Sequence, residues 1–472
     1  MAADTISFAR GAPSADILPV DAVREATARA LESDWQRALS YGTGIGHPEL
    51  CAWVASEFHG IDSEQVMFTN GSMEAAALLF RYMIEPGDRV IVEQPSYDRT
   101  LLLLRRTGAE SVGAPLESDG IDIPAVEAVR EAAATALEDD WERALSYCKG
   151  EGHRGLVEWI AERHSIAPAQ VMVTNGSLEA GAMLFEHLLE PGDRVIVEQP
   201  SYDRTLLLLG RLGVELVPVA LEADGLDVDE LESVLKDGPA KLAHLIPNFH
   251  NPAGCTLSAS KRERVLELAT EHGFWVFEDD PYRELPFEQP PPQTMLSNCG
   301  SDRVIHASSF SKTVSPGVRV GYLAGPEEQI TQLAKRANET YISPNMLAES
   351  VVWELCRSGG LDRNIEFVRG ALQERRDALV EALEEHLPEA DFVSPGGGYF
   401  LWLTLEEDID TVDLLAAALE EEVSFVAGPD FMLEGGRNSL RLSFAPVPAP
   451  QIDEGVGRLA RALERVRTAS PA

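Results

Sequence analysis

The chain has 472 residues, of which 44% are hydrophobic, and a formal net charge of −39. This length allows more than one domain, while so acidic a chain argues against nucleic acid as a partner, because phosphate binding needs a basic surface. No apolar run is long enough to span a bilayer, and no signal-peptide pattern opens the chain. The five cysteines are scattered and form no CxxC pair, which predicts no disulfide frame and no zinc or other metal site. We therefore expect a cytoplasmic protein with no membrane contact.

The first part of the chain contains an internal repeat. The string EPGDRVIVEQPSYDRTLLLL occurs at residues 85–104 and again at 190–209. Three similar pairs flank it: VDAVREATARALESDWQRALSY at 20–41 with VEAVREAAATALEDDWERALSY at 126–147, VMFTNGSMEA at 66–75 with VMVTNGSLEA at 171–180, and LESDGIDI at 116–123 with LEADGLDV at 221–228. The unit of about a hundred residues is too long, and present too few times, for a solenoid.

Each copy of the repeat predicts the same elements. In chain order these are a helix, a Gly-rich turn, a helix, a strand, a TNGS turn, a helix, a strand, a turn, a helix and a strand. The strands rest on VMFT or VMVT and on RVIVE, which are short β-branched runs beside turn residues. The helices carry Ala, Leu, Glu and Arg at amphipathic spacing.

The alternation of strands and helices continues after the repeat. Strands are expected in AHLIPN, FWVFEDD, RVIHASSFSK and GYLAG, with a helix from about Ser260. This order predicts an α/β large domain, with a mostly parallel sheet covered on both faces. After about Gln329 the pattern changes to long helices and then to GGGYFLWLTL and SLRLSFA, which suggest a smaller α+β domain. The predicted parts are an N-terminal arm (1–19), the first repeat copy as a displaced lobe (20–121), the second copy with the rest of the large domain (122–330), and the small domain (331–472).

Four motifs with polar residues follow one another in the second half. They are PNFHNPAG (247–254), FEDDPYREL (277–285), SSFSKTVSPGVRVGY (308–322) and RLSFA (441–445). Asn251 and Asp279 are 28 residues apart, and Asp279 and Lys312 are 33 apart. Each gap is close to one strand–helix–strand step of roughly thirty residues. The three residues are therefore expected at the edge of the sheet where open α/β sheets bind ligands.

In this combination the motifs resemble those of the fold-type I, class I and II aminotransferases, which use pyridoxal phosphate (PLP). Within them the chain is most similar to the aminoadipate, kynurenine and aromatic aminotransferases. The S-x-S-K-x(6)-R string is specific when Asn-Pro and Asp-x-x-Tyr precede it, whereas each motif alone is weak. The resemblance covers nearly the whole chain once one repeat copy is set aside. It implies a transaminase that moves an amino group from an L-amino acid to a 2-oxo acid, with 2-oxoglutarate as the expected acceptor.

The resemblance also implies a role for each polar residue around the cofactor ring. Lys312 would be the Schiff-base lysine and the proton carrier. Asp279 would pair with the pyridine nitrogen; Asp280 is the alternative by residue type, but Asp279 has the family's spacing to Tyr282. Asn251 and Tyr282 would bind the phenolic oxygen.

The remaining predicted contacts are with the phosphate, the ring face and the substrate. The phosphate would bind to the TNGS turn and to the Lys312 loop, the ring would stack on a tyrosine, and a tyrosine of a homodimer partner would reach the phosphate. These expectations fall on Gly176, Ser177, Ser309, Ser311 and Arg319 for the phosphate, Tyr202 for the ring, Tyr147 (or its repeat equivalent Tyr41) across the dimer, and Gly11, Asn251 and Arg441 for the substrate. Where the family often has Gln, this chain has His250, which we expect to support the site without reacting.

Only one copy of the repeat can complete one cofactor site. The chain holds a single Lys312 motif and a single Arg441 motif, so it resembles one aminotransferase with an internal tandem duplication of about 105 residues. The second copy is favoured because it runs without interruption into PNFHNPAG, which keeps the loops short. The opposite arrangement would keep the arm that carries Gly11 and loop out residues 122–226.

Several alternatives stay open on the sequence alone. The same fold hosts other PLP reactions, such as those of β-lyases and decarboxylases, and the duplication could leave an inactive PLP-binding protein. A PLP-binding regulator is a third alternative, but such proteins carry a basic helix-turn-helix domain that we do not find here. The acidic composition fits either a highly soluble protein or adaptation to high salt, where ions screen the self-repulsion; we favour the second. Aromatic, aminoadipate and branched-chain amino acids are the donors that the resemblance suggests.

Overall fold

The computed structural model describes residues 20–33, 46–57, 61–70, 72–84, 89–94, 110–115, 148, 150–298, 302–314, 318–341 and 343–469. The predicted contacts of Gly11, Tyr41 and Tyr147 lie outside these residues. Among the described helices, none combines the length and the apolar character needed to cross a membrane.

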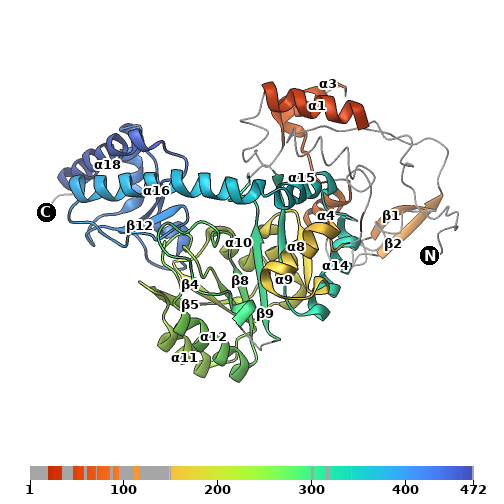
Figure 1. The fold of residues 1–472 in the computed structure, drawn as a ribbon, viewed down its shortest axis with the longest axis horizontal. Coiled ribbons are helices and arrows are strands. Elements are labelled where there is room, and N and C mark those ends of the chain that lie inside the picture. The colour runs from red at the N-terminus through yellow and green to blue at the C-terminus, as the bar shows by residue number, and fades with distance from the viewer. Residues whose placement is uncertain are drawn as a thin grey trace.

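An eight-stranded, mostly parallel sheet forms the centre of the molecule (Figure 1). Its order is β3 (Val171–Thr174), β10 (Gly321–Ala324), β9 (Val304–Ser309), β8 (Trp275–Asp279), β7 (Leu242–Leu245), β4 (Arg194–Gln199), β5 (Glu215–Glu222) and β6 (Gly225–Leu226). Strands β9, β8, β7, β4 and β5 run parallel, whereas β10 pairs antiparallel with both β3 and β9, and β6 turns back on β5. The α/β prediction is confirmed.

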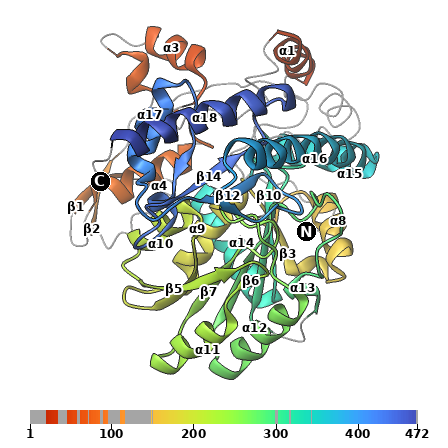
Figure 2. The same ribbon diagram turned by 90° about the vertical axis from the view of Figure 1, so that its left-hand side faces the viewer.

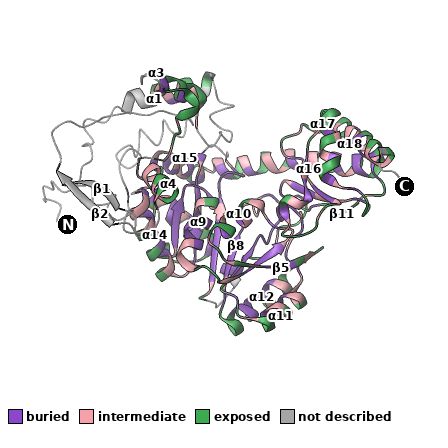
Figure 3. Ribbon diagram, turned by 180° about the vertical axis from the view of Figure 1, so that it is seen from behind, coloured by how far each residue is buried: buried purple, intermediate pink, exposed green. Residues whose placement is uncertain are grey.

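Helices cover both faces of the sheet, because alternate residues of its buried strands point to opposite sides. In β4, Ile196 packs in one core cluster, and Val195 and Val197 pack in the other. The first face is covered by α8 (Arg154–His164), α11 (Val228–Asp237), α12 (Ala259–His272) and α15 (Met346–Arg357), and the second by α9 (Ser177–Leu188), α10 (Asp203–Arg211) and α14 (Glu327–Tyr341). Short elements are η3 (Pro168–Gln170) and α13 (Met295–Asn298). Figure 3 shows the sheet as the most continuously buried part.

A second core belongs to the small domain. The long helix α16 (Gly360–His386) links the two cores, since Leu361 packs with the large domain and Leu372 with the small one (Figure 1). An antiparallel sheet completes the small domain, in the order β11 (Asp391–Phe392), β12 (Phe400–Thr404), β14 (Ser439–Ser443) and β13 (Val426–Ala427), with α17 (Thr411–Glu420), η5 (Gly428–Phe431) and α18 (Ala449–Ala469). Both α14 and α15 pack in the large-domain cores, so the change of core comes later in the chain than the boundary at 330/331.

The described strands of the first repeat copy lie outside the central sheet. Strands β1 (Arg89–Gln94) and β2 (Glu110–Pro115) of this copy form a separate two-stranded parallel sheet, while β3, β4 and β5 of the second copy belong to the central one. Its helical elements are α1 (Val20–Ser33), α3 (Pro48–Ser56), η2 (Ser63–Gln65) and α4 (Ser72–Met83). Both ribbon views place α1 and α3 apart from the central sheet (Figures 1 and 2).

One strand expectation is wrong in the first copy. Residues 66–69, VMFT, form no strand, although the equivalent VMVT forms β3. The two segments differ in whether a pairing strand is available. Strand β10 pairs with β3 along one edge and with β9 along the other, so β10 has no free edge for a second copy of this strand. A strand needs a neighbour for its backbone hydrogen bonds.

Candidate active site

A cavity of about 140 Å³ lies at the carboxyl ends of the central strands. Asp279 ends β8 and Ser309 ends β9, so parallel neighbours deliver both side chains to the same edge. Nine residues expected from the sequence line this one cavity: Ser177, Tyr202, Asn251, Asp279, Tyr282, Ser309, Ser311, Lys312 and Arg319. The arrangement brings together groups that are up to 142 positions apart, from Ser177 to Arg319.

One end of the cavity is built to hold an anion. The N-terminus of α9 begins here at Ser177, with the N-cap Gly176 at a φ of 97°, a value that L side chains rarely adopt. A Cβ on Gly176 would lie only 2.4 Å from Nη2 of Arg319. Arg319 Nη1 donates to Ser311 Oγ at 3.2 Å, and Ser309 Oγ donates to Ser311 Oγ at 2.9 Å. Helix N–H groups, a guanidinium and two hydroxyls together suit a phosphate.

At another wall, Asp279 offers an unused acceptor. The residue is buried at 8% exposure, and Oδ1 has no hydrogen-bond partner among the described residues. Oδ2 lies 3.6 Å from Nε2 of the buried His244, which Thr205 also approaches at 3.5 Å. A buried carboxylate oxygen without a partner is costly unless a donor reaches it. The protonated nitrogen of a pyridine ring is such a donor, so the site fits PLP at both ends.

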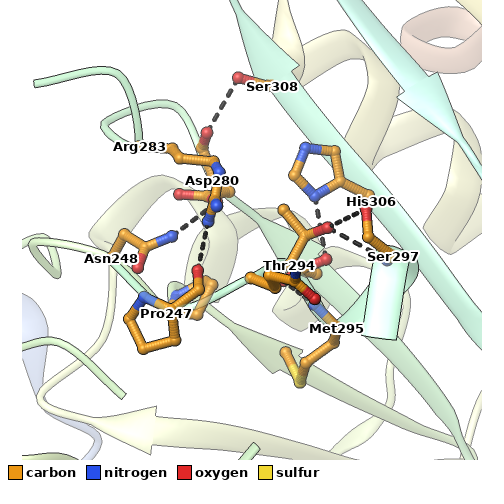
Figure 4. A network of polar contacts seen from close by, with 12 residues as sticks. Pro247, Asn248, Asp280, Arg283, Thr294, Met295, Ser297, His306 and Ser308 are labelled. Atoms are coloured by element: carbon orange, nitrogen blue, oxygen red, sulfur yellow. Dashed lines mark hydrogen bonds and ion pairs between the residues drawn. The ribbon is translucent and has the colours of Figure 1, made fainter. Parts of the chain in front are cut away.

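The neighbouring Asp280 is not among the residues that line this cavity, and it belongs to a polar network with Asn248 and Arg283 (Figure 4). Its Oδ2 accepts from Asn248 Nδ2 at 2.7 Å and lies 3.9 Å from Arg283, and burial raises its pKa to about 6. Glu278 and His306 lie close by, and one nitrogen or oxygen atom from each of the three side chains, of the kind that can bind a metal ion, lies within 4.8 Å of the other two. Because Nδ1 of His306 bonds to Glu278 at 3.0 Å and Asp280 bonds to Asn248, we interpret the group as polar support behind Asp279.

Lys312 lies in the loop that follows β9, with its amine beside two aromatic rings. Nζ is 5.5 Å from the ring centre of Tyr282 and 5.1 Å from that of Tyr399. The Tyr399 hydroxyl also donates to the backbone oxygen of Lys312, at 3.3 Å. Sequence reasoning missed Tyr399, because GGGYFLWLTL was used only as a strand pattern; its consecutive glycines before an aromatic residue were the available signal.

The small domain contributes Arg441 from β14. Its Nη1 donates to Oδ1 of Asn251 at 2.9 Å, and its guanidinium stacks on two rings, 4.4 Å from the centre of Phe400 and 4.7 Å from that of Phe431. Burial lowers the pKa of the Arg441 guanidinium below its ordinary value. A half-buried cation next to Asn251 suits a substrate carboxylate.

His250 lies just outside the cavity. It is fully buried, its Nδ1 accepts from the backbone N–H of Ala253 at 3.1 Å, and its Nε2 lies 3.1 Å from Oε2 of Glu198. It therefore supports the PNFHNPAG turn from behind.

A larger cavity, of about 560 Å³, lies beyond Pro281 and Ser309, which line both spaces. Arg163, His164 and Trp159 are among its walls, but Lys312, Asp279 and Arg319 are not. The chemistry of the lining, not the size, therefore identifies the smaller cavity as the candidate active site.

Comparisons with known proteins agree with this geometry. The model of the aminotransferase class I and II family matches residues 3–137 and 111–459. The 2-aminoadipate transaminase of Thermus thermophilus is 36% identical over 377 residues, which cover 79% of this chain and 94% of the relative. The aromatic-amino-acid aminotransferase 1 of Thermococcus litoralis is 34% identical, over 72% of this chain and 84% of the relative.

Solved structures give the same result. The alpha-aminoadipate aminotransferase LysN of Thermus thermophilus, complexed with N-(5'-phosphopyridoxyl)-L-leucine, has a TM-score of 0.69 and 35% identity, with 72% of this chain and 88% of that chain covered. Fold, cavity and matches define a fold-type I transferase that uses PLP. The chain belongs to the class I and II aminotransferases and is a transaminase, which confirms the activity and the cofactor expected from the sequence.

Proposed function

We propose that this transaminase uses the cavity around Lys312, completed by the second repeat copy, to move the amino group of an L-amino acid to 2-oxoglutarate. One observation carries the proposal: a lysine, an unpartnered buried carboxylate oxygen and a Ser–Ser–Arg anion cluster line the same cavity. These are the groups that a phosphorylated pyridine aldehyde needs. PLP, when bound, supplies an electron sink for the charge left at the substrate Cα after proton removal.

The residues divide the remaining work. Lys312 would hold the cofactor through its amine and would act as the general base and acid that moves the proton at the substrate Cα. Asp279 Oδ1 binds the ring nitrogen, and Asn251 and Tyr282 bind the phenolic oxygen. Arg441 binds the α-carboxylate, which orients the Cα–H bond toward Lys312.

The other predicted contacts complete the proposed site. Gly176, Ser177, Ser309, Ser311 and Arg319 hold the phosphate, Tyr202 stacks on the ring, Gly11 lines the substrate pocket, and Tyr147 of a homodimer partner reaches the phosphate. The placement of β3, β4 and β5 in the central sheet supports the second copy as the working one. The two overlapping family matches support an origin of the first copy in a tandem duplication. We further propose a cytoplasmic enzyme adapted to high salt.

The substrate side chain is proposed from the relatives. Relatives in two organisms are named for 2-aminoadipate and for aromatic amino acids, which all have long side chains. The rings of Phe400 and Phe431 lie 4.4 Å and 4.7 Å from the guanidinium of Arg441, so the surroundings of the proposed carboxylate contact are apolar.

The Lys312→Ala variant tests the proposal. The wild-type protein, incubated with PLP, should show the visible absorption band of lysine-bound PLP, and the variant should lack it. Turnover with 2-aminoadipate or phenylalanine and 2-oxoglutarate should fall by about 10²–10⁴-fold or more, the usual range for loss of a general acid–base group. Lys335→Ala, on the exposed side of α14, is the matched control and should behave like the wild type.

A Lys312→Ala protein that kept both the band and the turnover would overturn the proposal. The half-reaction separates the alternatives within the fold. Transamination converts the bound cofactor to pyridoxamine phosphate and releases a 2-oxo acid, whereas a β-lyase or a decarboxylase leaves PLP unchanged. An inactive protein would bind PLP without either conversion.

A further inference from the structure

Tyr399 of the small domain lies against Lys312 of the large domain. We infer that Tyr399 is a positioning residue for Lys312: its ring and its hydroxyl fix the lysine amine and backbone in the reactive place, so that a small-domain turn sets the geometry of the catalytic group. The inference rests on the proposed role of Lys312 as the cofactor lysine.

A turn of consecutive glycines brings Tyr399 to this place. A Cβ on Gly397 would lie 2.5 Å from the backbone oxygen of Leu285, and a Cβ on Gly398 would lie 2.6 Å from Cβ of Phe249. Gly398 also has a φ of 74°, in the left-handed region that favours glycine. Neither position can hold a side chain without a shift, so the glycines let the turn lie directly against Leu285 and Phe249.

Backbone hydrogen bonds hold the turn from both sides. Gly398 N–H donates to Leu285 O at 3.1 Å, and Phe287 N–H donates to Gly396 O at 2.8 Å. On the other side, Phe444 N–H donates to Tyr399 O at 3.2 Å. Tyr399 is thus fixed between the segment that follows Tyr282 and the end of the strand that carries Arg441.

The Tyr399 side chain makes two separate contacts with Lys312. Its hydroxyl donates to the backbone oxygen of Lys312 at 3.3 Å, and its ring centre lies 5.1 Å from Nζ. Tyr282 approaches the same amine at 5.5 Å, and the two ring centres are 5.6 Å apart. A cation is attracted to aromatic faces at these distances. The two rings therefore restrict where the Lys312 amine can lie, while the hydrogen bond from the Tyr399 hydroxyl fixes the backbone of Lys312.

This placement separates Tyr399 from the groups that hold the substrate. Arg441, the proposed carboxylate contact, donates to Asn251 and lies over the rings of Phe400 and Phe431. Loss of the Tyr399 contacts should therefore affect proton transfer by Lys312 and leave substrate binding nearly unchanged. The expected kinetic signature is a change in kcat with little change in KM.

Two variants of the holoenzyme divide the contacts. Tyr399→Phe removes the hydroxyl and keeps the ring, whereas Tyr399→Leu removes both. Phe367→Leu, an exposed aromatic residue on α16, is the control for an aromatic-to-leucine change. For each protein, the absorbance of bound PLP is titrated with pH without substrate, and kcat and KM are measured per bound cofactor.

We expect kcat to fall about threefold to tenfold in Tyr399→Phe, as for one hydrogen bond, and further in Tyr399→Leu, with KM within about twofold. The midpoint of the absorbance titration should shift in Tyr399→Leu and remain in Phe367→Leu. The inference would be overturned if both Tyr399 variants had the titration midpoint and the kcat of the wild type. It would also be overturned if the variants lost thermal stability but kept the wild-type kcat. If Tyr399→Leu fails to fold, Tyr399→Phe alone decides.

Lys312→Ala in the same titration separates this inference from the proposed function. If that variant keeps the absorption band, the role of Lys312 fails and the Tyr399 inference fails with it. If the band depends on Lys312 but the Tyr399 variants behave like the wild type, only the Tyr399 inference fails.

Discussion

Glu349 illustrates how one buried carboxyl group can link the stability of this protein to pH. The side chain lies on α15 at 1% exposure, and its Oε2 accepts from the backbone N–H of His153 at 2.5 Å. Oε1 has no hydrogen-bond partner among the described residues. Burial raises the pKa of Glu349 to about 8; the His153 bond opposes the rise, and Glu179 adds to it.

The direction of the pH effect follows from this raised pKa. The folded protein binds the proton more tightly than the unfolded chain, whose Glu pKa is about 4.3. The contribution of Glu349 to stability is therefore fully present below about pH 4.3 and is lost as pH rises toward about 8, by up to about 1.4 kcal/mol per pH unit. Above pH 8 the loss is complete.

Glu349→Gln should remove this dependence, because the amide keeps an acceptor for His153 and carries no charge. We expect the free energy of unfolding of the wild type to fall more steeply between pH 5 and 8 than that of the variant, which should be the more stable protein at pH 8. Urea unfolding at pH 5, 6.5 and 8 measures this. Glu327→Gln, the same change at an exposed position, is the control, and parallel curves for all three proteins would contradict the prediction.

At the scale of the elements, local pattern predicted the central strands well. RVIVE and VMVT are β-branched runs, and their burial in β4 and β3 is what such runs need. The spacing of Asn251, Asp279 and Lys312 then placed three polar residues at one sheet edge, because each strand–helix–strand step returns the chain to that edge.

The local sequence pattern could not predict contacts between elements that are distant in the chain. Tyr399 and Lys312 are 87 residues apart; the glycines of GGGYFLWLTL indicate a closely packed turn, but they do not indicate which distant residue its aromatic ring contacts. VMFT at 66–69 has the same strand propensity as VMVT, yet it forms no strand because the edge that such a strand would occupy pairs with β3. Competition between two similar segments is decided by partners that lie far away in sequence.

The identical twenty-residue strings allow a direct test of which repeat copy forms the site. Tyr202 lines the cavity beside Lys312, whereas its equivalent Tyr97 lies outside the described residues. In the full-length protein, Tyr202→Leu should weaken PLP binding by up to about tenfold, the range expected for one aromatic stacking contact. Tyr97→Leu, the same change in the same local sequence, should leave the dissociation constant unchanged.

Titration of the apoprotein with PLP, followed by absorbance, gives both dissociation constants. The reverse result, with Tyr97→Leu weak and Tyr202→Leu normal, would place the first copy in the site. Equal weakening in both variants would mean that the two copies share the central sheet among molecules.

An ion pair joins the two copies at equivalent positions. Arg81 of α4 and Glu186 of α9 are 105 residues apart, the same offset as Tyr97 and Tyr202. Two nitrogens of Arg81 lie 2.8 Å from the two carboxylate oxygens of Glu186, which Arg336 of α14 also approaches at 2.8 Å. The two copies thus carry opposite charges at the same repeat position, and this allows the equivalent helices α4 and α9 to contact each other. Two arginines or two glutamates at this position would repel each other.

For the whole molecule, the charge balance is the property most open to experiment. The chain has 78 acidic and 39 basic residues, and ion pairs such as those of Arg461 and Arg465 with Glu421 lie on the exposed surface of the small domain. Exposed pairs contribute about 0–1 kcal/mol each, so their loss in salt costs little. Repulsion within a net charge of −39 opposes the compact state, and salt removes it.

The melting temperature should therefore rise with salt. The Debye length falls from about 10 Å at 0.1 M to about 3 Å at 1 M, so most of the rise should occur in this range of KCl. A gain of about 1 kcal/mol corresponds to about 2–4 °C for domains of this size. Sucrose at matched osmolality controls for preferential exclusion, since it stabilises folded proteins without screening charge. A melting temperature that stayed constant or fell between 0.1 and 1 M KCl would remove the argument for salt adaptation and leave the charge as a source of solubility alone.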